Sequence, residues 1–430
     1  MIRNEQGLRI AKLYHVSVEN GKTAQSNKFY FMTEQPDGTT KCEWGRVGKT
    51  PKITILSPGE FDEVYREKTG PRKGYQDQTE LLVEKTISAP TVKTKTGEVI
   101  DIACTYVKSL FNDLMGYANK SIQQNYKVSQ EAVTEAQVNA AQALVDEITK
   151  DIKIGVNIQN LNAKILKLYT IIPRQMKDVR NHIFQPINDS SSLQKAQRLI
   201  ANEQDTLDTM AGQVALIKQQ RESEKVNEGV AAKKVDLLDQ MGLKVVHVTD
   251  AGTIKKIKDL MGPNANQFKK AYEVVNSKTE VKYINHVKNA SNKKEQLFWH
   301  GSRNENWFNI LQTGLLIRPA GAVHSGSMFG DGIYGANKAQ KSIGYTSLRG
   351  SYWASGSDNK AFLALFQFHV GNEKHIHRHD SSCYDLSKSK LSREGFDSVY
   401  AHGGIDLRND EFIVYDANQV TVKYLIEIGN

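Results

Sequence analysis

The stretch "LFWHGSRNENWFNILQTGLL", residues 297–316, decides the fold of the second half of the chain. Its apolar run ends at His300-Gly301-Ser302, and an amphipathic helix follows. A buried strand that ends on an imidazole, a residue without Cβ and a hydroxyl suits a polar ligand lying against the strand end. The stretch therefore predicts a strand-to-helix junction with a ligand site at the end of the strand.

The composition is that of a multidomain basic protein. The chain has 430 residues, 39% hydrophobic and 24% charged, with a formal net charge of +9. This length corresponds to roughly two to four domains. The positive charge favours polyanions such as nucleic acid, although many basic proteins bind none.

No apolar run reaches the ~18 residues of a membrane span, and the first residues lack the apolar stretch of a signal peptide. We therefore expect no membrane association and a protein that stays inside the cell. Its place would be the nucleus if the source is eukaryotic, and the cytoplasm or nucleoid if it is bacterial or phage-encoded.

The cysteines and histidines predict no metal site. Cys42, Cys104 and Cys383 are far apart and odd in number, which favours buried reduced thiols over a disulfide framework or a cysteine-based zinc site. The run "HIHRHDSSC", residues 375–383, carries alternate histidines without tetrahedral ligand spacing. We expect its histidines to be solvated loop residues.

The middle of the chain predicts an all-α block, because glycine is rare between residues 106 and 211. A first helix has the apolar face Val107, Leu110, Phe111, Leu114, Met115 and Ala118. Thr134 and Gln137 have the spacing of a capping box. They open a helix with the stripe Val138, Ala141, Val145 and Ile148. Further helices fit residues 161–170 and 193–220.

The two flanks of this block predict β structure. Residues 28–35 and 52–56 are β-prone runs, with a turn pair at Asp37-Gly38. After the block, strand-like runs lie at residues 362–370, 411–415 and 420–428. Two connecting segments, residues 86–99 and 222–236, divide the chain into three.

These segments resemble the DNA-dependent poly(ADP-ribose) polymerases. "LFWHGSR", "SMFGDGIYGANKAQKSIGYTS" and "NDEFIVYDANQVTVKYLIEI" resemble successive segments of the family's catalytic domain, in its order and spacing. "SNKFYFMTE", "CEWGRVGKT" and "FDEVYREKTGPRKGY" resemble the WGR domain, which senses DNA ends. "VTEAQVNAAQALVDEI" and "AKILKLYTIIPR" resemble the helical regulatory domain, which limits NAD+ access until DNA loosens it.

The resemblance implies a multidomain α+β fold. A β-rich WGR domain with linker would span residues 1–105, and an all-α regulatory bundle residues 106–222. An α+β ADP-ribosyltransferase domain would span residues 223–430.

The resemblance implies NAD+ as the substrate and no metal. Breaking the glycosidic bond releases nicotinamide as a neutral molecule, so no general acid need protonate it and one carboxylate can suffice. The transition state resembles the oxocarbenium ion of glycoside hydrolysis. By the family's pattern, the Gly301 backbone and the Ser342 hydroxyl hold the nicotinamide amide, and Tyr334 and Tyr345 sandwich its ring.

His300, Tyr334 and Glu411 match the family's catalytic triad. His300 and Ser302 would hold the adenine-side ribose. Glu411 would stabilise charge on the nicotinamide-side ribose and orient an attacking hydroxyl; in the family, glutamate here accompanies chain elongation. Asp410 is expected to be an exposed or capping acid, because adjacent strand residues face opposite sides.

The resemblance also implies contact with DNA ends or nicks. Trp44 would stack on the sugar of a terminal nucleotide, and Arg46 would help to link DNA contact to the helical domain. Lys68, Arg72 and Lys73 would contact phosphates. The residues alone also allow a tryptophan buried in the core and a basic cluster that serves only solubility.

The resemblance thus implies a DNA-dependent enzyme that builds poly(ADP-ribose) on acceptor proteins, with the enzyme itself as one candidate acceptor. The alternatives are a mono-ADP-ribosyltransferase, an NAD glycohydrolase, and a silent DNA-binding scaffold, against which the intact triad argues. The segment "YAHGGIDLRND", residues 400–410, is shorter than in chain-forming relatives, so polymer length stays open. Arg318 is a conceivable contact for the NAD+ phosphates.

Overall fold

The computed structural model describes residues 1–4, 6–18, 25–83, 104–126, 133–226, 237–317 and 328–430. These residues fall into two compact units, Met1–Lys93 with Ser121–Arg221 and Thr94–Lys120 with Glu222–Asn430. The predicted linker 86–99, residues 227–236 of the second junction and Arg318 lie outside the described residues. Among the described helices, none has the length and apolar character needed to cross a membrane.

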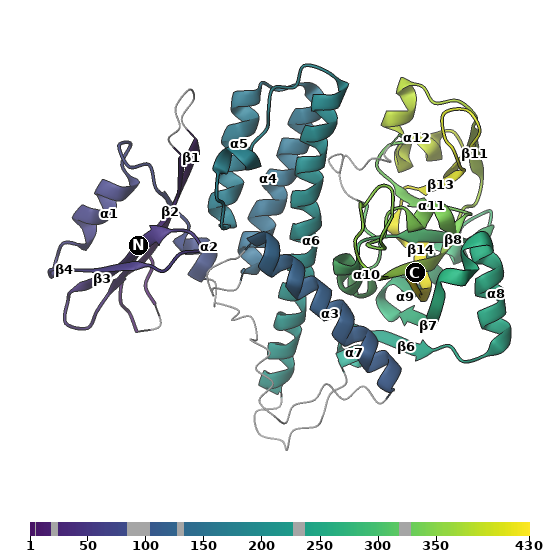
Figure 1. Ribbon diagram of the computed structural model, residues 1–430, viewed down its shortest axis with the longest axis horizontal. Helices are drawn as coiled ribbons and strands as arrows, with labels where there is room; N and C mark the ends of the chain where they lie inside the picture. The colour runs from purple at the N-terminus through teal and green to yellow at the C-terminus, as the bar shows by residue number, and fades with distance from the viewer. Residues whose placement is uncertain (5, 19–24, 84–103, 127–132, 227–236, 318–327) are drawn as a thin grey trace. The chain divides into compact units, whose positions relative to one another are not determined.

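The first unit begins with an antiparallel sheet of strand order β4-β3-β2-β1-β5 (Figure 1). Its strands are β1 (Ile10–Val18), β2 (Gln25–Glu34), β3 (Thr40–Arg46), β4 (Lys52–Leu56) and β5 (Gln76–Asp77). Helices α1 (Phe61–Thr69) and α2 (Thr79–Val83) follow β4 and β5. The strands expected at residues 28–35 and 52–56 are confirmed as β2 and β4, with the Asp37-Gly38 turn between β2 and β3.

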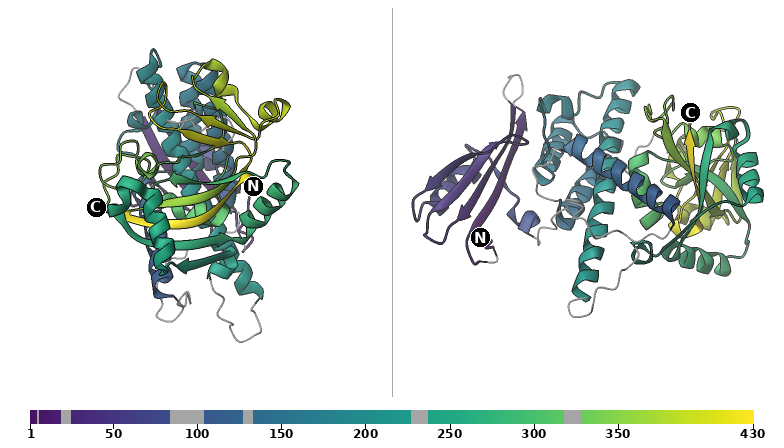
Figure 2. Two further views of the ribbon diagram at one scale, coloured as in Figure 1. Left: turned by 90° about the vertical axis from the view of Figure 1, so that its right-hand side faces the viewer. Right: turned by 60° about the horizontal axis from the view of Figure 1, so that its bottom comes forward.

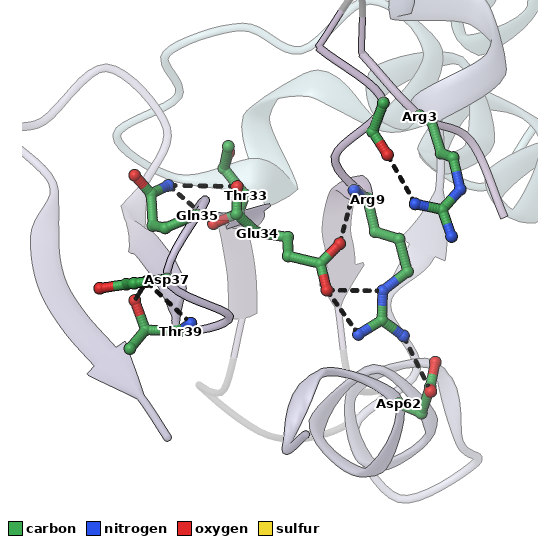
Figure 3. A network of polar contacts seen from close by, with 9 residues as sticks. Arg3, Arg9, Thr33, Glu34, Gln35, Asp37, Thr39 and Asp62 are labelled. Carbon is green, nitrogen blue, oxygen red and sulfur yellow. Dashed lines mark hydrogen bonds and ion pairs between the residues drawn. The ribbon is translucent and has the colours of Figure 1, made fainter. Parts of the chain in front are cut away.

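Arg9 ties α1 to this sheet (Figure 3). Its backbone N–H and guanidinium donate to the Glu34 carboxylate at 2.8–3.1 Å, and Nη1 donates to Asp62 Oδ2 of α1 at 2.9 Å. The hydrogen bonds from Arg9 lower the pKa of Glu34. Asp37 Oδ1 accepts hydrogen bonds from the Thr39 N–H and hydroxyl, which closes the turn between β2 and β3.

Three long helices complete the first unit and stand side by side in Figure 1. They are α4 (Glu135–Ile154), α5 (Ile158–Ile171) and α6 (Ser190–Val226). The capping box is confirmed, because Thr134 accepts from the Gln137 N–H while the Gln137 side chain accepts from the Thr134 N–H. The predicted stripe of α4 is buried, and Val16 of β1 belongs to the same apolar cluster. The sheet and the helices of this unit therefore share one core.

Helix α3 (Thr105–Tyr126) belongs to the second unit up to Lys120. Its predicted face is buried except for Met115, which is half-buried. Phe111 packs edge-on against Phe308, and Lys360 Nζ donates to Asp113 Oδ2 at 2.6 Å. The helix that opens the predicted all-α block therefore packs on the C-terminal part of the chain.

The second unit contains two further sheets. The larger has the order β6-β7-β14-β10-β8 and is antiparallel throughout. Its strands are β6 (Leu243–His247), β7 (Phe268–Asn276), β8 (Glu295–Gly301), β10 (Lys360–His369) and β14 (Val420–Gly429). The runs expected at residues 362–370 and 420–428 are thus confirmed as β10 and β14.

The smaller sheet has the order β11-β12-β13-β9. Its strands are β9 (Ile333–Gly335), β11 (Glu373–Ile376), β12 (Ser398–Ala401) and β13 (Glu411–Val414). Trp299 of β8 and Ala336 exchange two backbone hydrogen bonds of 2.8 and 3.0 Å, which join the two sheets. The yellow and green strands of this unit are seen from two sides in Figure 2.

Short helices flank these sheets. They are α7 (Leu237–Met241), α8 (Ala251–Met261), α9 (Ser277–Asn289), α10 (Trp307–Thr313), α11 (Ala339–Ile343) and α12 (Lys388–Arg393). Helix α10 is the helix expected after the strand end at residue 302, and α11 carries candidate site residues.

The cysteine prediction is wrong for one of the three residues. Cys42 and Cys383 are buried free thiols, as expected, whereas Cys104 is exposed. Cys104 immediately precedes the first residue of α3, so it lies outside the apolar face that this helix buries.

Candidate active site

The end of β8 approaches α11 so closely that only glycine fits. A Cβ on Gly301 would lie 1.9 Å from the carbonyl oxygen of Ser342, and Ser342 itself is buried. Real Cβ atoms do not tolerate such a contact, so any larger residue would push the two segments apart. Gly301 and Ser342 are therefore direct neighbours. Both are predicted from the sequence to bind the nicotinamide amide.

His300 and Tyr334 are joined through the backbone. His300 Nδ1 lies 3.1 Å from the Tyr334 carbonyl oxygen, which can only accept, so Nδ1 carries a proton and donates it to this carbonyl. The Tyr334 hydroxyl donates to the Gly330 carbonyl at 2.7 Å and accepts from the Phe329 N–H at 3.1 Å. Burial raises the pKa of Tyr334, which keeps its hydroxyl protonated.

Glu411 opens β13, which pairs with β9 so that Ile413 lies opposite Tyr334. Glu411 is only 6% exposed. Its Oε1 accepts a hydrogen bond from Lys341 Nζ of α11, and the two groups form an ion pair. Its other oxygen, Oε2, is buried and has no hydrogen-bond partner among the described residues. A buried carboxylate oxygen without a donor is costly unless a ligand supplies one.

Burial shifts both members of this pair toward their neutral forms. It raises the pKa of Glu411, and the attraction and hydrogen bond from Lys341 oppose that shift. It lowers the pKa of Lys341, and Glu411 opposes that shift in turn. Each group therefore favours the charged form of the other.

Lys341 is a residue of the candidate site that was not predicted from the sequence. Its only sequence signal is its position next to Ser342, and lysines beside polar residues are common on exposed helices. The pairing of β9 with β13 is needed to show that α11 and Glu411 come together.

Asp410 holds the connection between β12 and β13. Its carboxylate accepts hydrogen bonds from the Gly403 N–H at 2.8 Å, the Asn337 amide at 3.0 Å and the Tyr400 hydroxyl at 3.1 Å. Partial burial raises the pKa of Asp410, but these three hydrogen bonds outweigh it and the pKa lies below the ordinary value. Asp410 thus acts as a loop-capping acid, whereas the neighbouring Glu411 faces Lys341.

The remaining candidates flank these groups. The Tyr345 N–H donates to the Ser342 carbonyl at 3.1 Å in the turn that follows α11. Burial, followed by the charge of Glu411, raises the pKa of Tyr345 to about 12. Ser302 Oγ accepts from Asn306 Nδ2 at 3.1 Å, immediately beyond β8. The structure therefore gathers the ends of β8, β9, α11 and β13.

Comparison with known proteins shows the family of this chain. Residues 253–430 match the family model of the poly(ADP-ribose) polymerase catalytic domain. The poly(ADP-ribose) polymerase-like protein 100L of Invertebrate iridescent virus 6 is 36% identical over 163 residues, which cover 37% of this chain and 84% of the viral protein. This chain belongs to the poly(ADP-ribose) polymerase family.

Cellular relatives match different shares of the chain. The poly(ADP-ribose) polymerase of Drosophila melanogaster is 25% identical over 453 aligned residues, which cover 90% of this chain and 42% of the fly protein. Human poly(ADP-ribose) polymerase 2 is 31% identical over 157 residues, which cover 31% of this chain and 26% of the human protein. The chain is an NAD+ ADP-ribosyltransferase, with NAD+ as the substrate of its catalytic domain.

The histidine run of this enzyme, residues 375–383, is exposed at His375 and His377 as we expected, but His375 lies in β11 rather than in a loop. His375 Nδ1 and His402 Nε2 are joined by a hydrogen bond of 2.8 Å, and His377 stacks on His402 with ring centroids 4.0 Å apart. Tyr400 stacks on the same imidazole. In the part of the chain that the structure describes, no group of three or more His, Cys, Asp or Glu side chains is placed to hold a metal ion.

In the N-terminal sheet, Trp44 is half-buried. Its Nε1 donates to Thr54 Oγ1 at 3.0 Å, and its ring packs at the margin of the apolar cluster that includes Phe61 of α1. Tyr30 lies opposite Trp44 in the sheet, and Lys68 Nζ lies 4.8 Å from the centroid of the Tyr30 ring. Trp44 and Lys68 therefore lie on the same face of the sheet.

The basic residues of this region have different surroundings. Lys68, Arg72 and Lys73 lie 3.4, 3.6 and 4.0 Å from the carboxylate of Glu67. Arg46 instead donates from Nη2 to the carbonyl groups of residues 176 and 177, at 2.8 and 2.7 Å. The predicted DNA-binding residues are thus divided between a cationic cluster at the end of α1 and a contact with the segment after α5.

Proposed function

We propose that this enzyme is DNA-dependent and transfers ADP-ribose from NAD+ to acceptor proteins, building poly(ADP-ribose) and releasing nicotinamide. The observation that carries the proposal is the state of Glu411. One oxygen of this buried carboxylate is held by Lys341, and the other has no partner among the described residues. A fixed charge with one open acceptor position suits a site where positive charge develops on a sugar.

The nicotinamide half of NAD+ would lie between Gly301 and the two tyrosines. Gly301 and Ser342 are close neighbours, which supports a role for both in binding the nicotinamide amide. The Gly301 backbone and the Ser342 hydroxyl would form hydrogen bonds with this amide. Tyr334 and Tyr345 are both half-buried and their raised pKa values keep the hydroxyls protonated, so their rings are neutral surfaces for a cationic pyridinium. Stacking there would set the angle at which the glycosidic bond breaks.

The ribose steps would depend on His300, Ser302 and Glu411. The His300 imidazole, which the Tyr334 carbonyl orients through Nδ1, and the Ser302 hydroxyl would bind the adenine-side ribose. Glu411 Oε2 would accept a hydrogen bond from the other ribose and stabilise the oxocarbenium-like transition state. As the glycosidic bond breaks, its electron pair leaves with neutral nicotinamide.

Chain growth would use the same carboxylate a second time. A hydroxyl of the acceptor would donate to Glu411 and attack the anomeric carbon, passing its proton to the carboxylate as the new C–O bond forms. The charge on Lys341 favours the ionised form of Glu411 that this step requires. Lys341 therefore acts as a positioning residue in this mechanism.

DNA dependence would reside in the first unit. We assign residues 1–105 to a WGR domain, 106–222 to a helical regulatory domain and 223–430 to the catalytic domain. The alignment with the fly enzyme supports this order because it spans 90% of the chain. The Arg46 contacts with residues 176 and 177 support a mechanical link from the sheet that carries Trp44 to the helices.

A second candidate function is single-unit transfer or NAD+ hydrolysis. The short connection between β12 and β13 favours it, because Asp410 holds this connection beside Glu411. A constrained loop beside the site would leave less room for a polymer end than for a single side chain or water. Both candidates share the NAD+ contacts and differ only in the acceptor.

The test is incubation of the purified protein with radiolabelled NAD+, with and without nicked duplex DNA. Protein-bound chains are then separated from single units and from free ADP-ribose. We expect long protein-bound chains that form many times faster with DNA. Single units would favour the second candidate, and equal rates with and without DNA would contradict DNA dependence.

A further inference from the structure

The loop between α11 and β10, residues 344–359, folds back onto its own beginning. The N–H groups of Trp353 and Ala354 both donate to the Gly344 carbonyl, at 2.9 and 3.1 Å. A Cβ on Gly344 would lie 3.1 Å from Trp353 Cδ1, so the indole lies directly over the backbone that precedes Tyr345. The loop thus brings Trp353 back to Tyr345, eight positions earlier in the chain.

The backbone conformation of this loop brings Trp353 close to Tyr345. Ser355, with φ of 50°, is the only residue other than glycine with a positive φ among the described parts of the chain, a conformation that a serine rarely adopts. A Cβ on Gly356 would lie 2.3–2.4 Å from the backbone of Ser347 and Leu348. The Gly356 N–H donates to Ser351 Oγ at 2.8 Å. A strained turn and a close crossing therefore hold the loop in one conformation.

This conformation places two aromatic side chains in different ways. The Trp353 ring is nearly parallel to that of Tyr345, with centroids 6.1 Å apart and an interplanar angle of 18°. The rings of Tyr352 and Trp353 are nearly perpendicular, with centroids 4.7 Å apart, and Tyr352 is 78% exposed. Trp353 is itself 50% exposed, and its ring contacts are with these two tyrosines rather than with a buried apolar cluster. The loop therefore places the indole beside Tyr345 rather than in the core.

We propose that Trp353 is a positioning residue that stacks behind Tyr345 and sets the plane against which nicotinamide binds. The inference rests on the proposed role of Tyr345 in nicotinamide stacking. An offset aromatic pair restricts rotation of the Tyr345 ring, so its opposite face is presented to the pyridinium at one angle. The indole also adds electron density behind the phenol, which strengthens attraction to a cationic ring.

The experiment compares the full-length enzyme with three variants, Trp353→Ala, Trp353→Phe and Tyr352→Ala. The measurements are the inhibition constant of nicotinamide, KM and kcat for NAD+, the affinity for ADP-ribose, which lacks nicotinamide, and the melting temperature. Trp353→Ala should weaken nicotinamide and raise KM about three- to tenfold, the range expected for the loss of one aromatic pair. ADP-ribose affinity and melting should stay unchanged.

The other two variants separate stacking from general packing. Trp353→Phe keeps a flat ring and should recover most of the nicotinamide affinity. Tyr352→Ala removes the exposed neighbour and should leave every measurement as in the wild type. Unchanged nicotinamide affinity in Trp353→Ala overturns the inference. So does an equal loss of nicotinamide and ADP-ribose affinity, because that result indicates disruption of the whole site.

Tyr345→Ala distinguishes failure of this inference from failure of the proposed function. If Tyr345→Ala leaves nicotinamide affinity unchanged, the role of Tyr345 is wrong, and the role of Trp353 falls with it. If Tyr345→Ala weakens nicotinamide, the double variant with Trp353→Ala should weaken it no further, because Trp353 acts through Tyr345. Additive losses in the double variant overturn the positioning role alone.

Discussion

The two candidate sites of this protein hold their charges in opposite ways. In the catalytic unit, the Lys341 and Glu411 side chains are 14% and 8% exposed and form an ion pair. At the end of α1, Arg72 is 81% exposed and shares Glu67 with Lys68 and Lys73. The first site is a buried pair and the second an open cluster in water.

The difference teaches how each site should respond to substitution. A buried pair has lost its hydration, so removing one member leaves the other charge uncompensated and costs ~3–5 kcal/mol. Exposed ion pairs are worth only ~0–1 kcal/mol, and their phosphate contacts weaken with salt. Single changes should therefore have large effects in the catalytic unit and small, graded effects at the cationic cluster.

The largest effect is expected for Glu411→Gln. This change keeps the shape of the side chain and removes the charge and the basicity that chain growth requires. Polymer formation should fall by ~10² or more, with residual hydrolysis or single-unit transfer. Chain length and rate are measured on gels with labelled NAD+. The matched control is Asp410→Asn, which should lose far less, and wild-type polymer formation in Glu411→Gln would remove this residue from the mechanism.

Lys341→Met should shift the pH dependence of the same reaction. The pKa of Glu411 is already raised by burial, and Lys341 opposes that rise, so removing the lysine raises the pKa further. The carboxylate is the active form, so activity is lost as pH falls through this pKa. The acidic limb of the kcat profile should therefore move to higher pH.

The loss in Lys341→Met at neutral pH should reach roughly tenfold for each unit by which the Glu411 pKa exceeds the pH. Lys341→Arg keeps the positive charge and should leave the limb nearer its original position. An unshifted acidic limb in Lys341→Met would contradict the electrostatic role of this pair.

Trp44→Ala tests the N-terminal site at a half-buried aromatic residue. Loss of one stacking contact should weaken DNA binding by ~1–3 kcal/mol and abolish DNA-stimulated activity, while turnover without DNA stays the same. Trp44→Phe should recover part of the binding. Because the Trp44 ring also packs at the margin of the α1 cluster, melting is measured alongside. Unfolding of the first unit in Trp44→Ala would show that the tryptophan is a core residue.

The smallest effect is expected for Lys73→Ala. An exposed phosphate contact should weaken binding to all DNA sequences about equally, and the slope of log affinity against log salt should fall by about one. Lys255→Ala is the control, because Lys255 is an exposed lysine of α8 with the same charge. Equal changes in the two variants would mean that only net charge matters.

Local features of the sequence predicted much of the fold. The Thr134-Gln137 box starts α4 because the two residues satisfy each other's backbone donors, a requirement met within one helical turn. The stripes of α3 and α4 are buried where apolar residues recur at helical spacing. The segments carrying His300 and Glu411 also lie at strand positions that the sequence indicated, whereas the strand that carries Tyr334 was not predicted.

What the sequence by itself determined is therefore the order of elements, their buried faces and the family. Only the tertiary structure decided which faces meet: α3 packs against Phe308, Gly301 approaches Ser342, and Lys341 reaches Glu411. Spacing along a helix or strand specifies which side is apolar but not its partner, because that choice depends on pairing between strands far apart in the chain. The exposure of Trp353 behind Tyr345 follows from the same cause, since a strained turn at Ser355 decides where the indole lies.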